Sequence, residues 1–328
     1  MNSSPIISLG MGSGGVLSRF ILGCATIGNL SHPMSDDDAT EVLETAWNAG
    51  VRTFDTAPHY GVGLSEERLG RFLSGRDRSH FVVSTKVGRL LVPSDQDVDG
   101  VEGFFATPRR ARIRDYSREG VRKSIEQSCE RLQLEHVDIV LIHDPDDYEE
   151  VALDEAYPAL VELRDEGVVR AIGLGMNQVP MLERFVAKTD IDCVLVANCY
   201  SLLNSEADAG FFELCASRGV AVLVGGVFNS GVLANPSAGQ YGYAPPSEEV
   251  LHRVSEIESV CLRYDVSLAA VALDYVLRNP RVTAAVVGAR SGGEVHENVT
   301  NLSVEVPDAL FVELRDRGLT EVPRWAPS

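Results

Sequence analysis

Short runs of apolar, often β-branched residues alternate with longer polar segments of helical period along the whole chain. The short runs predict eight strands, at residues 20–24, 51–55, 81–86, 137–142, 169–174, 193–197, 220–224 and 282–287. Because a helical pattern follows most of these runs, the chain reads as a series of repeated strand–helix units.

The segments between the strands carry the signals of helix ends. Residues 35–50 open with Ser35 and three acidic residues, which suit the positive end of the helix dipole, and close on Gly50. Further helices are predicted at residues 64–73, 117–132, 153–167, 180–188, 205–219 and 247–265, with two extra ones at 266–280 and 307–318. Eight strand–helix units favour a closed (β/α)8 barrel over a doubly wound sheet.

Two segments, residues 88–117 and 225–247, are too long to be ordinary connections. Both follow the ends of predicted strands, where the active sites of such barrels lie, so we expect them to shape a functional site. The segment GCATIGN (23–29) does not match the dinucleotide-binding pattern G-x-G-x-x-G. Since no linker interrupts the repeat, we expect a single domain over residues 1–328.

Composition limits the partners and the location. The chain has 48 acidic residues against 29 Lys and Arg, a net charge of −19, which would repel nucleic acids and anionic membranes. No apolar run approaches the ~20 residues that a membrane span needs. The six cysteines form no C-x-x-C pair. We therefore expect a cytoplasmic protein with reduced thiols, no nucleic-acid or membrane partner and a small-molecule substrate; a homo-oligomer is left open.

Polar residues stand where the predicted strands end. Asp55 ends the second strand, Lys86 ends the third, His143 follows the fourth, and Tyr60 lies five residues past Asp55. In a barrel these four side chains converge on one rim.

The four residue types suit proton transfer. A tyrosine phenol has an ordinary pKa near ~10, and a neighbouring ammonium such as Lys86 lowers it by favouring the phenolate. A desolvated lysine needs a carboxylate, which Asp55 can supply from the adjacent strand. His143 can orient a carbonyl or hydroxyl oxygen against Tyr60. The pattern offers no activated nucleophile.

Other polar clusters have simpler interpretations. The acidic residues after His143 form a solvated turn, and no second His or Cys is spaced to complete a metal shell, so we expect no metal. The run RRARIR (109–114) is interpreted as a charged loop face. His59 is as compatible with a substrate contact as with a surface position, and Tyr241 and Tyr243 with a sugar pocket as with loop packing.

The segments GVRTFDTAPHYG (50–61) and LIHDPD (141–146), together with Lys86, resemble the aldo-keto reductase superfamily. The resemblance implies a (β/α)8 barrel with an N-terminal hairpin and extra C-terminal helices, and an NAD(P)-dependent oxidoreductase. It assigns Asp55, Tyr60, Lys86 and His143 to the catalytic tetrad. Residues 104–117 and 225–234 are similar to the branch of L-fucose and D-threo-aldose 1-dehydrogenases, to which pyridoxal 4-dehydrogenase is also similar.

The same resemblance implies the residues that hold a nicotinamide cofactor. They are Asn177, Asn198, Phe228, Ser230, Gly231, Leu233, Gly288, Arg290, Glu294, Glu297 and Asn298. Asn198 stands beside Ala197, which replaces the glutamine that the family often has there. Glu294 stands where NADP-dependent members place an arginine; a carboxylate repels a 2′-phosphate and accepts hydrogen bonds from a ribose hydroxyl, so NAD is favoured over NADP.

The tetrad is compatible with several activities. The leading expectation is oxidation of an aldose at C1 to the lactone. The alternatives are oxidation of the pyridoxal hemiacetal to 4-pyridoxolactone, broad aldehyde or ketone reduction, and, from a different class, a non-catalytic subunit that senses the cofactor.

Overall fold

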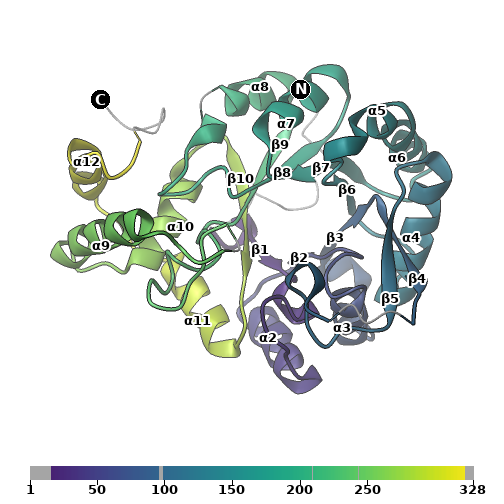
Figure 1. Cartoon of the computed structure of the whole chain (residues 1–328), viewed down its shortest axis with the longest axis horizontal. Helices are drawn as coiled ribbons and strands as arrows, with labels where there is room; N and C mark the ends of the chain where they lie inside the picture. Colours follow the sequence, from purple (N-terminus) through teal and green to yellow (C-terminus); the bar gives the residue numbers. More distant parts are fainter. Residues whose placement is uncertain (1–15, 96–98, 209, 243, 322–328) are drawn as a thin grey trace.

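Eight parallel strands close into a barrel, in the order β1-β10-β9-β8-β7-β6-β3-β2, in a computed structural model that describes residues 16–95, 99–208, 210–242 and 244–321 (Figure 1). The barrel strands are β1 (Phe20–Gly23), β2 (Thr53–Asp55), β3 (Val82–Val87), β6 (Ile139–His143), β7 (Ala171–Met176), β8 (Cys193–Ala197), β9 (Ala221–Gly225) and β10 (Val282–Gly288). Each overlaps its predicted range, so the predicted strands and the (β/α)8 architecture are confirmed.

Helices surround the barrel (Figure 1). They are α2 (Asp36–Asn48), α3 (Leu64–Leu73), α4 (Arg118–Leu132), α5 (Glu149–Val151), α6 (Tyr157–Asp165), α7 (Val179–Lys188), α8 (Phe211–Arg218), α9 (Glu248–Arg263), α10 (Leu268–Arg278), α11 (Gly292–Asn301) and α12 (Asp308–Asp316). The capping signal at Ser35 is confirmed, because its side chain accepts a hydrogen bond from the Asp38 amide at the start of α2.

Two predicted helices differ from expectation at their first residues. The one predicted at 153–167 opens with a π-helical segment, Ala152–Ala156, before α6, and the one at 205–219 begins at Phe211 because the chain turns at Gly210, with φ 131°. The N-terminal hairpin implied by the resemblance falls on residues outside the described part of the chain; Val16–Arg19 form a 3-10 helix that leads into β1.

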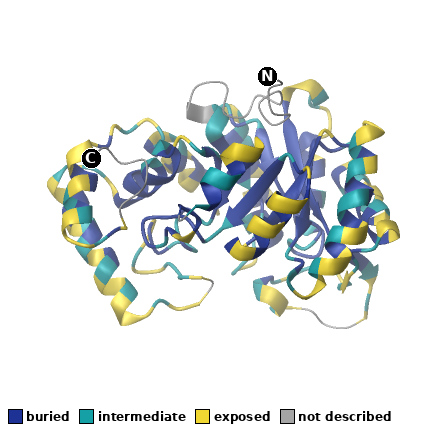
Figure 2. Cartoon of the chain, turned by 90° about the horizontal axis from the view of Figure 1, so that it is seen from above, coloured by how far each residue is buried: buried dark blue, intermediate teal, exposed yellow. Residues whose placement is uncertain are grey.

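The barrel strands separate two layers of apolar side chains. Alternate strand residues such as Ile139, Leu141 and Leu223 pack together in one small cluster, while their neighbours Val140 and Ile142 join the larger cluster shared with the helices. Figure 2 shows the strands as the buried centre and the helices with exposed outer faces. The interior of the barrel is therefore a packed core, and only its ends are available for chemistry.

The long segment after β3 contains a hairpin that the sequence interpretation missed. Strands β4 (Arg89–Pro93) and β5 (Arg110–Arg114) pair antiparallel outside the barrel. The interpretation of residues 109–114 as a loop face was wrong. Arg110 of this strand pairs with Glu67 of α3 at 2.6 Å, and Arg112 pairs with Glu102 at 3.1 Å. Ion pairs, rather than an apolar face, hold β5 in place.

Among the described residues, no helix combines the length and the apolar character that crossing a membrane requires. No group of three or more histidine, cysteine, aspartate or glutamate side chains there is arranged to hold a metal ion. All six cysteines are free thiols.

Candidate active site

Strand periodicity brings three of the predicted residues to one end of the barrel interior. Lys86 lies two and four residues beyond Ser84 and Val82 on the same face of β3, and His143 continues the inward series of Ile139 and Leu141. Asp55 ends β2 and is paired in register with Ser84, whose hydroxyl donates to Asp55 Oδ1 at 2.9 Å. The three side chains meet where β2, β3 and β6 end.

Lys86 is buried with its ammonium fully engaged. Its Nζ donates to Asp55 Oδ2 at 2.7 Å and to the Thr56 carbonyl oxygen at 2.9 Å, and it forms a third hydrogen bond with Tyr60. Burial alone lowers the pKa of Lys86, but the charges and hydrogen bonds of Asp55 and Tyr60 raise it more, so its pKa lies above the ordinary value. Lys86 is a permanent cation beside the phenol.

Tyr60 enters the site from the loop after β2. Its ring centroid lies 4.7 Å from Lys86 Nζ and 5.9 Å from the His143 ring, which meets it edge-on. Phe104, from the connection between β4 and β5, stacks on the Tyr60 ring with the two centroids 6.1 Å apart and an interplanar angle of 26°. The phenol thus stands between a cation, an imidazole and an apolar cover. The four residues predicted for the tetrad are brought together.

His143 is a neutral imidazole. Burial lowers its pKa well below the ordinary value, and the positive charges of Arg89 and Lys86 lower it further. Its Nε2 lies 3.4 Å from Asp144 Oδ2. Tyr116, which is buried, donates from its hydroxyl to the carbonyl oxygens of His143 and Asp144 at 2.6 and 2.8 Å, fixing the backbone where β6 ends. A neutral His143 offers one N–H donor to a ligand oxygen.

His59 lies beside the site and not on the surface; its contact with substrate stays a prediction. Its side chain is 13% exposed, and its ring lies 5.6 Å from the ring of His143 and 5.1 Å from that of Phe104. Burial, with the charges of Arg89 and Arg112, lowers the pKa of His59 to about 2. His59 is therefore a second neutral imidazole beside His143.

The residues predicted to hold a cofactor lie on the other arc of the rim. Asn177 directly follows β7, Asn198 follows β8, Phe228, Ser230, Gly231 and Leu233 follow β9, and Gly288 to Asn298 run from the end of β10 into α11. In the barrel order these four strands are neighbours, whereas β2, β3 and β6 carry the tetrad. The residues predicted for the tetrad and those predicted to hold a cofactor thus lie on two different arcs of the same rim.

A buried polar atom without a hydrogen-bond partner indicates that this arc of the rim binds a polar ligand. Asn198 adopts a left-handed backbone with φ 60°, and its side-chain Oδ1 is buried with no hydrogen-bond partner among the described residues. A Cβ on Gly226 would lie 2.2 Å from that oxygen, so only glycine leaves room for it. An amide N–H of a nicotinamide carboxamide fits this acceptor, because buried polar atoms require partners.

The turn after β9 is built from internal hydrogen bonds. The amides of Gly231 and Leu233 both donate to the Phe228 carbonyl oxygen, at 2.9 and 3.2 Å, and the Leu233 side chain is completely buried. Gly231 and Leu233 therefore set the shape of the turn, and Phe228, Ser230 and Gly231 are partly buried and keep some exposed surface.

The start of α11 holds the candidate ribose site. Ser291 caps the helix, and Glu294 Oε2 accepts a hydrogen bond from the Arg290 amide at 2.8 Å. The Arg290 guanidinium lies 3.3 Å from His32 Nδ1. Glu294, Arg290 and Glu297 are exposed, whereas Asn298 is buried with its Nδ2 donating to the Gly288 carbonyl oxygen at 3.5 Å. A negative side chain thus stands in the first turn of this helix.

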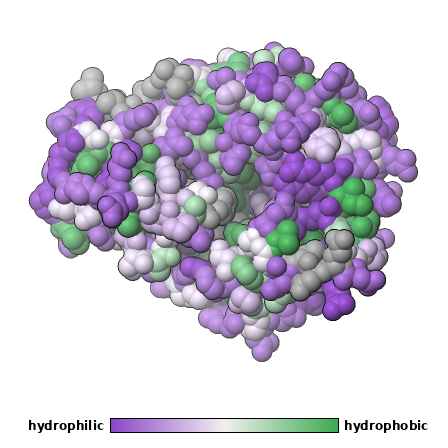
Figure 3. Space-filling view, viewed as in Figure 1, coloured by the Kyte–Doolittle hydropathy of each residue, from purple (hydrophilic) through white to green (hydrophobic). Residues whose placement is uncertain are grey.

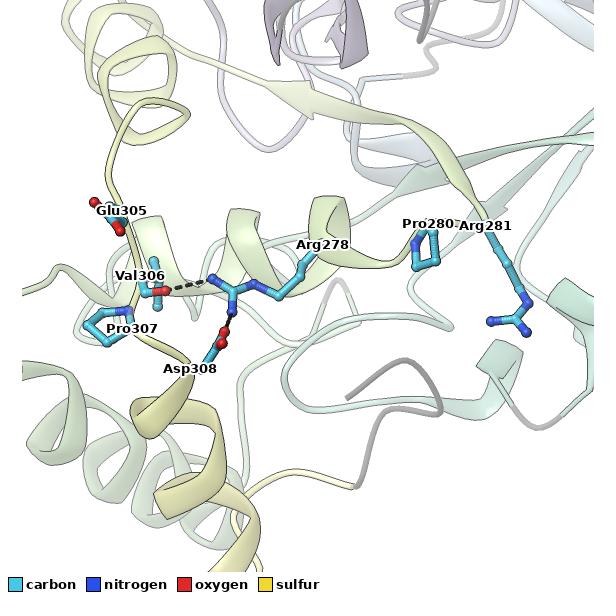
Figure 4. Close-up of a pocket in the computed structure, with 7 residues that line it drawn as sticks. All are labelled: Arg278, Pro280, Arg281, Glu305, Val306, Pro307 and Asp308. Atoms are coloured by element: carbon cyan, nitrogen blue, oxygen red, sulfur yellow. Dashed lines mark hydrogen bonds and ion pairs between the residues drawn. The ribbon is translucent and has the colours of Figure 1, made fainter. Parts of the chain in front are cut away.

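The face seen in Figure 1 is mostly hydrophilic and is hollowed near its centre (Figure 3). A different cleft lies between the end of α10 and the segment before α12 (Figure 4). Its two arginines are already engaged: Arg278 with Asp308 and the Val306 carbonyl oxygen, and Arg281 with Glu213. Because this cleft lies at the start of β10 and Gly288 at its end, it is not part of the candidate active site.

Sequence reasoning missed four residues that surround the tetrad, namely Arg89, Glu102, Phe104 and Arg112. All come from the hairpin or its connection. Arg112 donates from Nε and Nη2 to the His59 carbonyl oxygen at 3.3 and 3.1 Å. The available signal was the length of the segment, which marked it as functional without showing which side chains face the rim.

The chain is similar to known proteins in both sequence and fold. A model described as the aldo/keto reductase family matches residues 19–316. A D-threo-aldose 1-dehydrogenase of a Pseudomonas species is 40% identical, covering 92% of this chain and 94% of the relative. A pyridoxal 4-dehydrogenase of Microbacterium luteolum is 34% identical, covering 91% and 93%. Among solved structures, a glycerol dehydrogenase of Gluconobacter oxydans aligns with a TM-score of 0.72 at 24% identity, covering 91% and 90%, which supports the fold.

Proposed function

The chain belongs to the aldo/keto reductase family, and we propose that this NAD(P)-dependent oxidoreductase oxidises a neutral aldose at C1 to the lactone, with Tyr60 as the base. The observation that carries the proposal is the contact of the buried Lys86 ammonium with both Asp55 and the Tyr60 phenol, beside neutral His143. The 40% identity to a protein named as an aldose dehydrogenase supports the choice of substrate class.

In this proposal the four side chains divide the work. Tyr60 accepts the proton of the anomeric hydroxyl, because the Lys86 cation stabilises the phenolate that must be present first. Asp55 holds Lys86 in place and balances its charge. His143, being neutral, donates a hydrogen bond to the oxygen of the reacting C–O bond and orients it toward Tyr60. A bound nicotinamide supplies the acceptor for the hydride of C1.

The residues on the other arc fit that cofactor. Asn198 Oδ1 and Asn177 would hold the carboxamide, and the exposed surface of Phe228 and Ser230 would border the pyrophosphate. Glu294 would accept hydrogen bonds from a free ribose hydroxyl and would repel a 2′-phosphate, so we propose NAD as the preferred cofactor. We also propose that residues 1–328 act as one domain in the cytoplasm.

A substrate screen tests the proposal. The purified protein is incubated with NAD and, in turn, with L-fucose, D-arabinose, L-galactose and pyridoxal, and NADH formation is followed by absorbance. We expect turnover with at least one aldose, and the lactone as product. Turnover with pyridoxal and with no aldose would overturn the proposal in favour of the second candidate, oxidation of the pyridoxal hemiacetal, which the 34% identity to pyridoxal 4-dehydrogenase supports. NADH-dependent aldehyde reduction without oxidation of either class would leave only a general reductase.

A further inference from the structure

Arg89 is a buried arginine with unused donors at the site. It is the first residue of β4, and 6% of its surface is exposed. Its Nη2 donates to Asp144 Oδ2 at 3.0 Å, but its Nε and Nη1 are buried with no hydrogen-bond partner among the described residues. A buried guanidinium nitrogen without a partner is costly, and such an atom in a native protein calls for a ligand or water.

The Arg89 guanidinium is close to the reacting end of the site. Asp144 Oδ2, which accepts from Arg89, also lies 3.4 Å from His143 Nε2, so a single carboxylate oxygen separates the two side chains. Among the charged residues near His59 and His143, Arg89 has the largest effect on both imidazoles. When His143 holds an oxygen of the ligand, the ligand atoms next to that oxygen therefore lie beside Arg89.

The turn at Gly88 sets this position. The backbone leaves β3 two residues after Lys86 through Gly88, whose φ is +104°, and Arg89 begins the hairpin strand. A Cβ on Gly88 would lie 2.2 Å from the Tyr116 ring, so glycine is required at this step. The catalytic lysine and Arg89 are thus placed by one short, conformationally fixed segment.

The charges around the site favour a neutral ligand. Its two buried cations and the partly buried Arg112 each already have a carboxylate: Lys86 pairs with Asp55 at 2.7 Å, Arg89 with Asp144 at 3.0 Å and Arg112 with Glu102 at 3.1 Å. A carboxylate or phosphate on the substrate would face Asp144 as well as Arg89. A hydroxyl group suits this mixture, because it accepts from a guanidinium and donates to a carboxylate at once.

His59 adds a second orphan atom to the same place. Its Nδ1 is buried without a hydrogen bond among the described side chains, with Glu102 Oε2 3.5 Å away, and its ring lies 5.6 Å from that of His143. Two groups with polar atoms that make no hydrogen bond among the described residues, one cationic and one neutral, therefore lie close to His143. Neither has a role in the proton transfer assigned to Tyr60.

We propose that Arg89, assisted by His59, forms a subsite that binds the hydroxyl on the carbon next to the reacting carbon and so selects substrates with a neutral vicinal diol. The inference rests on the proposed function and deepens it, since it names the substrate feature that the site reads. Arg89 donates hydrogen bonds from Nε and Nη1 to the oxygen of that hydroxyl, and the hydroxyl donates its own hydrogen bond to the Asp144 carboxylate.

The test compares two sugars that differ at one hydroxyl. Values of kcat/KM are measured for L-fucose and 2-deoxy-L-fucose with the wild type, with Arg89→Met and with Arg109→Met, a control in which an exposed arginine before β5 is replaced. We expect the wild type to prefer L-fucose and the control to keep that preference. Arg89→Met loses about 10- to 100-fold with L-fucose and much less with the deoxy sugar. Equal losses with both sugars, or no loss, would overturn the subsite.

A second variant covers the case in which Arg89→Met does not fold. Arg89→Lys keeps the charge beside Asp144 but lacks the planar fork, and we expect it to fold and to lose most of the discrimination between the two sugars. Binding of L-fuconolactone by calorimetry gives a readout without turnover, and we expect the affinity to fall in both Arg89 variants. Unchanged affinity in a folded variant would contradict the subsite.

Failure of the subsite and failure of the proposed function give different results. If no aldose is oxidised, the aldose proposal fails, and the subsite is tested in the reducing direction with D-glyceraldehyde and propanal, which differ in hydroxylation. Loss of preference for glyceraldehyde in Arg89→Met would then support the subsite alone. No preference in the wild type, or no turnover in either direction, would overturn it.

Discussion

Lys86 Nζ lies 2.7 Å from Asp55 Oδ2, and both side chains are almost completely removed from solvent. The ion pair joins the ends of β2 and β3, which are neighbours in the barrel. A pair so deeply buried is held by its own attraction and by the hydrogen bonds around it, because neither partner is solvated. Removing one partner therefore affects folding as well as chemistry.

Asp55→Asn should destabilise the protein. The substitution leaves the Lys86 cation buried without its carboxylate, and we expect the free energy of unfolding in urea to fall by about 3–5 kcal/mol. The matched control is Asp36→Asn, whose carboxylate pairs with Arg68 and Arg71 but is 63% exposed; we expect a loss of about 1 kcal/mol or less there. Similar losses at both positions would contradict the assignment of a structural role to the buried pair.

Tyr60→Phe should abolish turnover and spare cofactor binding. The variant removes the hydroxyl that we propose as the acceptor of the substrate proton and keeps the ring that packs against Phe104. We expect kcat to fall by about 10²- to 10⁴-fold. Quenching of protein fluorescence by NADH should give an unchanged Kd. Retained turnover would remove Tyr60 from the mechanism. A wild type that binds the cofactor but shows no turnover with any substrate would instead favour a sensing role.

Glu294→Arg should shift the cofactor preference toward NADP. The change replaces the carboxylate in the first turn of α11 by a cation that can bind a 2′-phosphate. We expect the ratio of kcat/KM for NADP to that for NAD to rise about 10-fold or more. Glu248→Arg makes the same charge change in the first turn of α9 and serves as the control. An equal rise in both variants would show an effect of net charge only.

Stability should decline in acid because two imidazoles are buried in neutral form. The pKa of His59 is lowered to about 2 and that of His143 is lowered well below its ordinary value, mainly by burial. Below the ordinary histidine pKa of about 6.5 the unfolded chain binds protons at these positions and the folded chain does not. The free energy of unfolding therefore falls as the pH drops from about 6 to 4, by about 1.4 kcal/mol per pH unit for each histidine.

Denaturation in urea at a series of pH values measures this slope. His59→Gln removes one titrating group, and we expect the slope to decrease by about 1.4 kcal/mol per pH unit. His252→Gln, at an exposed position on α9, should leave the slope unchanged. An unaltered slope in His59→Gln would mean that its imidazole is protonated in the folded protein.

Gly88→Ala should disturb the site through Tyr116. The added methyl group would meet the Tyr116 ring, and φ at Gly88 is +104°. We expect a loss of about 2–4 kcal/mol of stability. Gly167→Ala is the control, because Gly167 has φ +76° but nothing within 4 Å of the added atom, and the expected loss there is about 1 kcal/mol. Thermal unfolding of the two variants gives the comparison, and equal shifts in Tm would contradict the steric argument.

The barrel and the tetrad were accessible from the sequence because both obey a simple periodicity. Each strand is a short apolar run between helical segments, and Asp55, Lys86 and His143 end such runs on the inward face. The β4–β5 hairpin shows no apolar periodicity in the sequence. Ion pairs such as that of Arg110 with Glu67 hold it in place. No local pattern could reveal it.

The surroundings of the tetrad depend on contacts between distant residues. Arg89 and Asp144 are 55 positions apart in the chain, and their contact requires both the turn at Gly88 and the left-handed backbone of Asp144, with φ 43°. His59 could not be assigned from sequence for the same reason. Its ring contacts Phe104 and its carbonyl oxygen accepts from Arg112, and both residues belong to the hairpin region. These features follow from the tertiary arrangement alone.

The hairpin stands outside the barrel ladder, yet it carries the arginines that contact Asp144 and the His59 carbonyl oxygen beside the candidate site. Mutations in its connecting segment can therefore accumulate without breaking a single hydrogen bond between barrel strands. A change of ligand preference through this hairpin would therefore leave the arrangement of Asp55, Lys86 and His143 at the ends of the barrel strands intact.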